Sequence, residues 1–191
     1  MKKLSIMLVG VGGQGTLLAS RVLGNVALKE NYDVKVSEVH GMSQRGGSVV
    51  TYVKLGDKVY SPLIEKGEAD IILSFEQLEA LRWIEFLTPD GKMIINEQRI
   101  DPMPVIMGKA KYPEEIIGKL KNNYDNIVSV DALSIAKACG NIKAVNIVLL
   151  GVMAKSTSIS KEVWIEAMKE VIPPKVIDVN LKAFEEGYKL G

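Results

Sequence analysis

Strand-length apolar runs alternate with helix-period patterns through the first two thirds of this 191-residue chain. The continuous apolar run at residues 4–9 is typical of a strand covered on both faces. The pattern at residues 14–30 places its apolar residues on one face of a helix. Further strands are predicted at residues 33–39, 48–55, 69–75, 92–96 and 127–130. Because this alternation is typical of crossover helices on a largely parallel sheet, the sequence predicts a three-layer, Rossmann-like α/β fold with helices on both faces of the sheet.

Turn residues and helical patterns complete the expected architecture. Gly56-Asp57-Lys58 predicts a turn after which residues 59–61 pair back as a hairpin, so we expect a mixed sheet. Thr88-Pro89-Asp90-Gly91 carries strong turn chemistry that would end a helix over residues 76–87. The other expected helices, which include a helical C-terminal third, are 112–123, 132–139, 145–154, 160–172 and 174–188. The sequence contains no linker or repeat, and we expect a single domain over residues 1–191.

Composition excludes several classes of protein and of site. Lys and Arg number 24 against 23 Asp and Glu, a balance that argues against a dedicated nucleic-acid binder. The single cysteine, Cys139, and the single histidine, His40, cannot supply the ligands of an iron–sulfur cluster or a structural zinc, so we expect no metal site. No window reaches the roughly 18 consecutive apolar residues of a membrane span, and the N-terminal pattern is not that of a signal peptide. We therefore expect a cytoplasmic protein that contacts no membrane.

A glycine-rich motif follows the first predicted strand. The segment GVGGQG at residues 10–15 matches G-x-G-x-x-G between a strand and a helix, the context that this motif requires. Glycines there allow backbone N–H groups to approach a phosphate at the helix N-terminus. A close-packed turn that needs small residues is the alternative interpretation. The residues that we expect to contact a cofactor are Gly10, Gly12, Gly13, Gln14 and Gly15.

A dinucleotide site would also need an acidic residue about 20 positions after the glycines, at the end of the second strand. Asp33 and Glu38 flank that position, whereas Lys35 lies nearest to it. The glycines of the dinucleotide-binding pattern are therefore present, but the acidic residue is not at the expected position, and NAD binding remains an open alternative.

The segment HGMSQRGG at residues 40–47 is more distinctive. It leaves the carboxyl end of the second predicted strand, where open α/β sheets bind ligands, and we expect it to lie beside the glycine motif. Arg45 can bind a carboxylate or phosphate through two parallel N–H bonds, and His40 can donate, accept or titrate near neutral pH. We predict catalytic roles for His40 and Arg45 and ligand contacts for Ser43 and Gln44. A solvated turn is the alternative.

Glu76 and Asn146 are two further polar residues with both a functional and a structural interpretation. Glu76 follows the strand at residues 69–75, near the expected crevice, so it could contact a cofactor or serve only as an acidic residue at a helix N-terminus. Asn146 lies in an otherwise apolar helix and is interpreted as forming a packing hydrogen bond.

Four segments together resemble one family. GVGGQG, EVHGMSQRGGSV, GEADIILSFEQLEALR and IPPKVIDVNLKAFEEGY occur in the order and at the subunit length of the gamma-subunit family of 2-oxoacid:ferredoxin oxidoreductases. The HGMSQRGG form is similar to the indolepyruvate branch, whereas pyruvate-type relatives tend to carry an ERRG-type sequence there. The resemblance spans nearly the whole chain.

The resemblance implies a component of an enzyme that oxidatively decarboxylates an aryl pyruvate on thiamine diphosphate. Electrons would leave through iron–sulfur clusters to ferredoxin, and coenzyme A would take the acyl group. Thiamine and clusters would belong to a partner alpha subunit, and the single cysteine independently agrees that this chain carries no cluster. The chain alone would then bind no cofactor and be inactive. We expect residues 100–107 and the C-terminal third to face the partner, with self-association in its absence.

Two other functions remain open at this point. One is a free-standing NAD-linked oxidoreductase that uses the glycine motif. The other is a non-catalytic subunit that binds a nucleotide-like ligand as a scaffold.

Overall fold

The computed structural model describes residues 3–41 and 46–191. Within these residues the chain forms one six-stranded sheet in the order β2-β3-β1-β4-β5-β6. The strands are β1 (Leu4–Val11), β2 (Asp33–His40), β3 (Ser48–Gly56), β4 (Ala69–Ser74), β5 (Leu87–Asn96) and β6 (Ile127–Val130). β1, β4, β5 and β6 run parallel, whereas β3 is antiparallel to its neighbours β1 and β2. The mixed, mostly parallel sheet expected from the sequence is confirmed.

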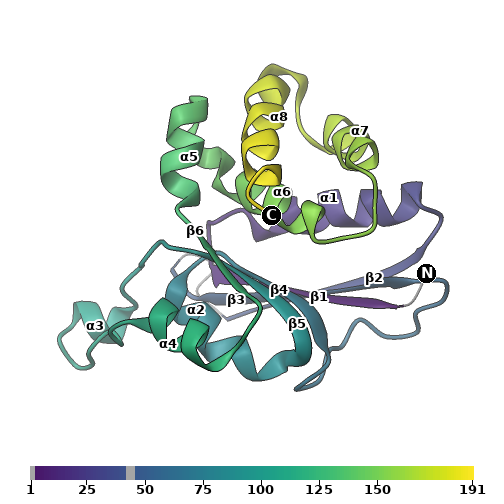
Figure 1. Ribbon diagram of the computed structural model, residues 1–191. Helices are drawn as coiled ribbons and strands as arrows, with labels where there is room; N and C mark the ends of the chain where they lie inside the picture. The colour runs from purple at the N-terminus through teal and green to yellow at the C-terminus, as the bar shows by residue number, and fades with distance from the viewer. Residues whose placement is uncertain (1–2, 42–45) are drawn as a thin grey trace.

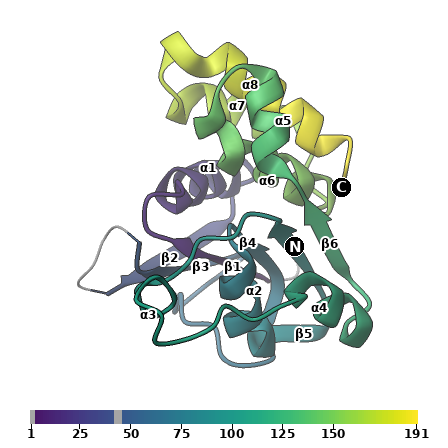
Figure 2. The same cartoon turned by 90° about the vertical axis from the view of Figure 1, so that its left-hand side faces the viewer.

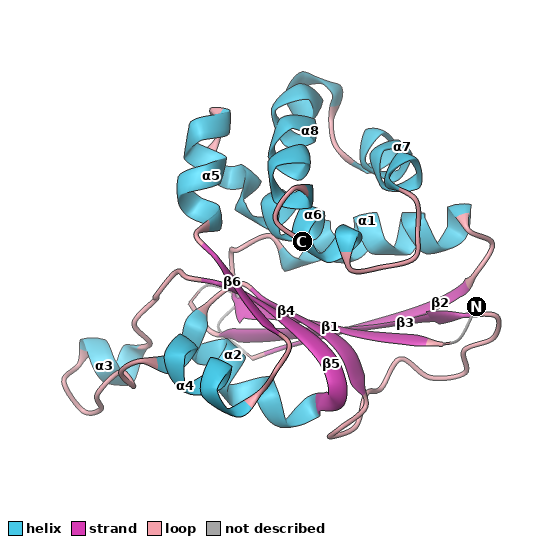
Figure 3. Cartoon of the chain, in the orientation of Figure 1, coloured by secondary structure: helices cyan, strands magenta, loops and turns pink. Residues whose placement is uncertain are grey.

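Helices cover both faces of the sheet, as Figures 1 and 3 show. Their bounds are α1 (Thr16–Lys29), α2 (Gln77–Trp83), α3 (Met103–Ile106), α4 (Ile116–Asn123), α5 (Ala132–Cys139), α6 (Val145–Lys155), α7 (Lys161–Val171) and α8 (Pro174–Tyr188), with short 3-10 helices η1 (Ile84–Phe86) and η2 (Ile142–Ala144). α1 and α5 to α8 lie on one face, and α2 and α4 lie on the other; Figure 2 shows the same layers from the side. The three-layer arrangement and the helical C-terminal third are thus confirmed.

β1 connects the two cores. Ile6 and Leu8 point into the core under α1 and the C-terminal helices, and Met7 and Val9 point into the core with α2 and α4. All four side chains are at most 1% exposed. A strand buried on both faces needs apolar side chains on both, which explains the uninterrupted apolar run from Ile6 to Val9.

The expected hairpin after Gly56 is wrong. Residues 59–61 form no strand; Val59 is buried, and its N–H donates to the Asp33 carboxylate at 2.9 Å. The antiparallel part of the sheet is instead the β2–β3 hairpin together with the β1–β3 pair.

Two further boundaries differ from the prediction. β5 begins at Leu87 and continues through residues 88–91, because a shift in its pairing with β4 absorbs these turn-forming residues as a bulge. The helix expected from residue 112 begins only at Ile116, because Tyr112 is buried and its hydroxyl bonds to Glu76, while Glu115 has a positive φ of 55°.

α6 is the central helix of the C-terminal third. Ten of its 11 residues are buried, because it lies between α1 and β5 on one side and α8 on the other. Two glycines let α6 and α8 approach closely. A Cβ at Gly151 would lie 2.2 Å from the carbonyl oxygen of Phe184, and one at Gly187 would lie 2.0 Å from that of Val148. No helix in the described part of the chain is long and apolar enough to cross a membrane.

Gly151→Ala should lower the free energy of unfolding by about 2–3 kcal/mol, because the added methyl group meets backbone atoms that cannot rotate away. Urea denaturation measures the change. Gly24→Ala is the matched control: Gly24 lies within α1, a Cβ there meets nothing within 4 Å, and alanine favours a helix by up to about 1 kcal/mol. Equal losses in the two variants would contradict the close contact of α6 with α8.

Lys54 is a charged residue within β3, and it is only 4% exposed. Its ammonium group donates to the Glu68 carboxylate at 2.9 Å, and Lys3 donates to the same carboxylate at 3.1 Å. Burial raises the pKa of Glu68, but the N–H of Glu65 and the two lysines outweigh burial and lower that pKa to about 2. Glu68 is therefore the counterion that permits a lysine inside the sheet.

The Lys54–Glu68 pair should make stability depend on pH. An unfolded glutamate has a pKa of about 4.3, so the lower folded pKa of Glu68 stabilises the fold above about pH 5, and this stabilisation is lost as the pH falls toward 2. Glu68→Gln should cost about 1 kcal/mol at neutral pH, since solvent screens a partly exposed carboxylate, and less at acidic pH. Urea titrations across this range measure the difference, with Glu162→Gln on the exposed side of α7 as control. A cost that does not change with pH would contradict the assignment.

Candidate functional site

The glycine motif forms the connection from β1 to α1. Gly13 and Gly15 have φ angles of 103° and 85°, values that L side chains rarely adopt. Gly10 is required for a different reason: a Cβ there would lie 2.9 Å from both the Gln14 Oε1 atom and the Phe75 Cβ atom. The motif therefore needs glycine both for backbone conformation and for close packing.

Gln14 turns its side chain inward. Its Oε1 atom accepts from the Val11 N–H at 2.7 Å, and its Nε2 atom donates to the Phe75 carbonyl at 2.9 Å and to Gln98 Oε1 at 3.4 Å. Phe75 follows β4 and Gln98 follows β5, so the amide fills the point where β1 and β4 send their following helices to opposite faces of the sheet. A ligand contact from this amide, as predicted, would require these internal bonds to break.

The two predicted motifs meet. The Gly12 N–H donates to the Gly47 carbonyl at 2.8 Å, and the Gly46 N–H donates back to the Gly12 carbonyl at 3.3 Å. β2 runs in the same direction as β1, with β3 between them. His40 and the glycine motif therefore lie at the same end of the sheet, where β1 and β2 have their carboxyl-terminal ends. Ser43, Gln44 and Arg45 lie outside the described residues, and their roles stay predictions.

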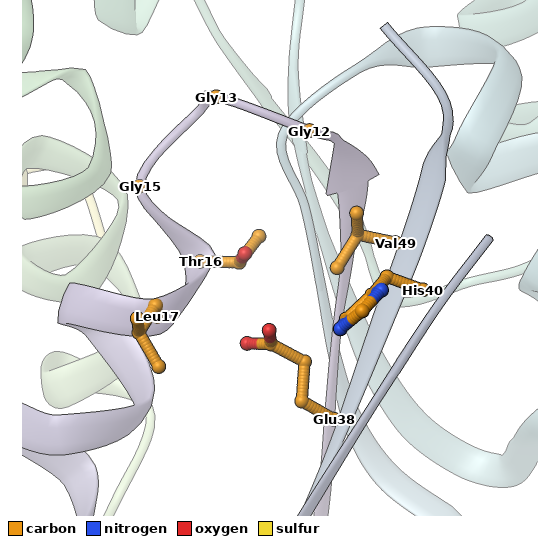
Figure 4. A pocket seen from close by; sticks show the side chains of 8 residues that line it. All are labelled: Gly12, Gly13, Gly15, Thr16, Leu17, Glu38, His40 and Val49. Atoms are coloured by element: carbon orange, nitrogen blue, oxygen red, sulfur yellow. The ribbon is translucent and has the colours of Figure 1, made fainter. Parts of the chain in front are cut away.

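A cleft of about 470 Å³ opens between the start of α1 and the β2–β3 edge. Figure 4 shows its lining. The lining residues are Gly12, Gly13, Gly15, Thr16, Leu17, Glu38, His40 and Val49. His40 is thus in the cleft, as are three of the five predicted residues of the glycine motif.

The start of α1 gives the cleft an anion-binding character. α1 begins at Thr16 with Gly15 as its N-cap, and its first turn contains neither a side-chain cap nor an acidic residue. The N–H groups of a helical first turn have no acceptor within the helix, and the helix dipole makes this end partly positive. An anionic group of a ligand is the complementary partner.

Glu38, which the sequence offered only as a possible acidic residue of a dinucleotide site, and Thr16, which was not predicted, also line the cleft. The Glu38 carboxylate points into the cleft from β2, on the same strand face as His40, with the Thr16 hydroxyl across from it (Figure 4). A carboxylate opposite an anion-binding helix end suits a ligand that carries hydroxyl or N–H donors as well as an anion. The period-two spacing of Glu38 and His40 was the signal in the sequence that could have paired them.

Glu76 lies outside this cleft. It is 0% exposed and caps α2, with Oε2 accepting from the Glu79 N–H at 3.0 Å. Oε1 accepts from the Ile100 N–H at 3.0 Å and from the Tyr112 hydroxyl. Burial and the Glu76 carboxylate raise the pKa of Tyr112, so its hydroxyl keeps the proton that it donates. Contact with a cofactor, as predicted, would require these capping bonds to break.

Glu79 holds the end of the HGMSQRGG segment. The carboxylate is 3% exposed and accepts from the Ser48 hydroxyl at 2.5 Å, while Arg82 lies 3.2 Å away. Burial raises the pKa of Glu79. The residue therefore ties α2 to the first residue of β3, a contact between distant segments that its position in a helical first turn did not suggest.

Metal ligands do not gather in the described residues. No group of three or more His, Cys, Asp or Glu side chains there could hold a metal ion, and Cys139 is buried and free. These residues therefore fit neither an iron–sulfur cluster nor a protein-held metal.

Comparison with known proteins decides the family. Residues 5–190 match the family model described as pyruvate ferredoxin/flavodoxin oxidoreductase. The chain is 44% identical to indolepyruvate oxidoreductase subunit IorB of Pyrococcus horikoshii, over 99% of this chain and 96% of that protein. It is 41% identical to the subunit of the same name from Archaeoglobus fulgidus, over 97% of this chain and 94% of that protein. The chain belongs to the pyruvate ferredoxin/flavodoxin oxidoreductase family.

Within this family the chain is a component subunit of an indolepyruvate ferredoxin oxidoreductase, which confirms the resemblance in the sequence. Solved structures share the fold at lower identity. The gamma subunit of keto/oxoacid ferredoxin oxidoreductase from Geobacter sulfurreducens superposes with a TM-score of 0.73 at 24% identity, over 97% of this chain and 96% of that one. The 2-oxoglutarate:ferredoxin oxidoreductase of Magnetococcus marinus superposes with a TM-score of 0.71 at 18% identity, over 100% of this chain but 31% of that longer chain.

Gly15→Ala should disturb the wall of the cleft. A Cβ at Gly15 would lie 2.6 Å from Asn146 Nδ2, and the φ of 85° is strained for alanine, so we expect a loss of about 1–3 kcal/mol in the free energy of unfolding. Gly41→Ala is the control, since a Cβ there meets no atom of the described residues within 4 Å and no positive φ is involved. Urea denaturation compares the two variants. A loss at Gly41 as large as that at Gly15 would contradict the packing described for Gly15.

Proposed function

We propose that the cleft of this subunit binds coenzyme A in an enzyme that oxidatively decarboxylates indolepyruvate and related aryl pyruvates. The observation that carries the proposal is the junction of the glycine motif with the β2–β3 loop at the uncapped N-terminus of α1. Coenzyme A carries several phosphates, and a helix N-terminus lined by glycine is a ready site for such groups. The Magnetococcus marinus enzyme, which shares the fold, was solved with coenzyme A bound.

Residues of this chain would bind and orient the ligand. The first-turn N–H groups of α1 would hold a phosphate. The Arg45 guanidinium group would donate two parallel, charge-assisted hydrogen bonds to it. The Glu38 carboxylate and the Thr16 hydroxyl would bond to ribose hydroxyls on the opposite side. His40 shares this wall, where its imidazole would donate or accept a hydrogen bond. Coenzyme A, when bound, supplies the thiol that accepts the acyl group.

The remaining cofactors belong to partners in this proposal. A chain whose one cysteine is buried and free has no ligand set for a cluster. Thiamine diphosphate and the iron–sulfur clusters would therefore lie in an alpha subunit, and ferredoxin would receive electrons through the complex.

The NAD-linked alternative is less well supported. A Rossmann dinucleotide lies across the crevice where neighbouring strands send their helices to opposite faces. Here the Gln14 amide lies at that crevice and bonds to the Val11 N–H and the Phe75 carbonyl, and a dinucleotide that used this amide would have to displace these bonds. The cleft lies instead on the β2 side of the glycine motif.

The arm between β5 and α4, residues 97–115, is the surface that we assign to the partner subunit. It includes α3, which stands away from the sheet (Figure 1). Its apolar residues Met103, Ile106 and Met107 are 62%, 66% and 56% exposed. The C-terminal helices, by contrast, bury much of their apolar surface in the chain's own core. Self-association through the arm is expected when the partner is missing.

Reconstitution tests the proposal. The subunit is co-expressed with a candidate thiamine and iron–sulfur subunit, and 2-oxoacid-dependent viologen reduction is measured while coenzyme A is varied. Arg45→Ala should raise the KM for coenzyme A by about 30-fold, corresponding to about 2 kcal/mol for a charged hydrogen-bonded partner. Arg45→Lys should recover only part of this loss, because lysine lacks the fork.

A truncated acyl acceptor sharpens the test. Pantetheine lacks the nucleotide phosphates, so Arg45→Ala should leave its KM unchanged. Arg21→Ala on the exposed side of α1 is the control for general loss of charge. If the Arg45→Ala complex assembles normally and all kinetic constants are unchanged, the HGMSQRGG segment is a structural turn and the scaffold alternative is favoured.

A further inference from the structure

Glu79 is a buried carboxylate that the proposed function does not use. It is 3% exposed and lies on the face of the sheet that α2 and α4 cover, whereas the cleft that we propose for coenzyme A lies on the face that α1 covers (Figure 1). The sheet therefore separates Glu79 from any ligand in the cleft. Because a carboxylate out of water is costly unless donors compensate it, the partners of Glu79 indicate what it does.

The Ser48 hydroxyl is the partner of Glu79 that comes from another element. It donates to Glu79 Oε2 at 2.5 Å, and the Trp83 indole N–H donates to the same oxygen at 3.3 Å. The Arg82 guanidinium group lies 3.2 Å from Glu79 Oε1. Arg82 and Trp83 belong to α2 itself, whereas Ser48 begins β3. The Ser48 bond therefore joins the helix to the sheet.

Ser48 lies between two residues that build the cleft. Gly47 precedes it, and the Gly47 carbonyl accepts from the Gly12 N–H at 2.8 Å. Val49 follows it, lines the cleft and is paired with His40 in the β2–β3 register. Since successive side chains of a strand point to opposite faces, the Ser48 hydroxyl faces α2 while Val49 faces the cleft. A shift of Ser48 would move the wall that Gly12, His40 and Val49 form.

Stability alone does not account for a carboxylate at position 79. Burial and the negative charge of Glu76, one turn earlier, raise the pKa of Glu79, so two buried carboxylates in one short helix oppose each other. An apolar side chain packed beneath β3 would avoid this cost. Hydrophobic packing is non-directional, whereas a hydrogen bond fixes both a distance and an angle. The carboxylate therefore adds a defined position for Ser48.

We propose that Glu79 is a positioning residue for the ligand of the cleft, because through the Ser48 hydroxyl it holds the wall formed by Gly12, His40 and Val49. It touches neither the ligand nor a reacting atom, since it lies on the other face of the sheet. This role rests on the proposed function, in which the ligand is coenzyme A. Loss of the Ser48 bond should loosen the wall and weaken ligand binding without changing the chemistry at the thiol.

Amide hydrogen exchange of the full chain, followed by NMR, tests the positioning role without any ligand. Ser48→Ala removes the hydroxyl, and Glu79→Met removes the carboxylate but keeps an unbranched side chain. Each should speed exchange of the Gly12 amide about tenfold, the size expected for one hydrogen bond to a charged group. The Phe75 amide, which bonds to the Val9 carbonyl, is the internal reference for stability of the sheet.

Matched variants separate this bond from a general effect on α2. Glutamine keeps an acceptor for Ser48, so Glu79→Gln should restore most of the protection that Glu79→Met loses. The double variant should exchange no faster at Gly12 than the faster single variant, because both substitutions remove the same bond. Glu85→Met is the control and should change nothing at Gly12, since Glu85 is a carboxylate of η1 that pairs with Lys66 at 2.9 Å. Unchanged Gly12 exchange in both single variants, or additive effects in the double variant, would overturn the proposal.

The reconstituted complex gives a second readout. Ser48→Ala should raise the KM for coenzyme A about tenfold and leave kcat unchanged, which is the pattern of lost ligand binding. A purely structural loss would instead lower the apparent kcat by reducing the amount of folded enzyme, and it would leave the KM unchanged. That second pattern would contradict the positioning role.

The two proposals fail separately. If Arg45→Ala leaves the KM for coenzyme A unchanged but Ser48→Ala still speeds Gly12 exchange, the ligand assigned to the cleft is wrong and Glu79 still positions the wall. If Arg45→Ala raises this KM and Ser48→Ala does not, the role of Glu79 in binding is wrong and the coenzyme A assignment stands.

Discussion

The side-chain amide of Gln14 joins three segments that are distant in the sequence. It accepts from the Val11 N–H within its own turn, donates to the Phe75 carbonyl after β4 and reaches Gln98 after β5. Each such bond contributes about 1 kcal/mol net, but the larger effect is geometric. With the turn anchored on the β4 side, the glycine motif cannot move into the crevice of the sheet, and its other side is left facing β2. The position of the cleft that we propose for coenzyme A depends on this anchor.

Two buried carboxylates hold the segments around that anchor. Glu76 binds the N–H of Ile100 at one end of the arm and the Tyr112 hydroxyl at the other, so the arm is a closed loop attached to the start of α2. Glu79, one turn later, binds Ser48 at the end of the HGMSQRGG segment. A single helix of seven residues thus fixes both the surface assigned to the partner and one boundary of the cleft. Because a buried carboxylate is costly without donors, neither contact can be lost without a large effect on α2.

Two clefts share the glycine motif as a wall. The first presents a helix N-terminus, a carboxylate and an imidazole, and suits a ligand with both phosphates and hydroxyls. The second, of about 550 Å³ on the other side of the glycine motif, is lined also by residues of α5, η2 and α6. Gly15 connects them, since it caps α1 and its carbonyl accepts from both the Asn146 side chain and the Ala19 N–H. Glycine is required there by a positive φ and by the proximity of Asn146, so one residue serves the conformation of both clefts.

The sequence by itself determined the layered fold, the β1–turn–α1 unit and the meeting of the two motifs at one sheet edge. These features follow from local periodicity and from glycine, whose effects act within a few residues. It also determined that this chain, with one cysteine and one histidine, cannot by itself supply the ligands of an iron–sulfur cluster, because ligand count is a property of composition. Tertiary structure alone decided that the Gln14 and Glu76 side chains form hydrogen bonds within the chain and that Pro89 and Gly91 lie within a strand. It alone decided that Asn146 packs against Gly15, which is distant in the sequence. Each of these outcomes depends on which distant group supplies a donor, an acceptor or a packing surface, and such pairings between distant segments leave no periodic trace in the sequence.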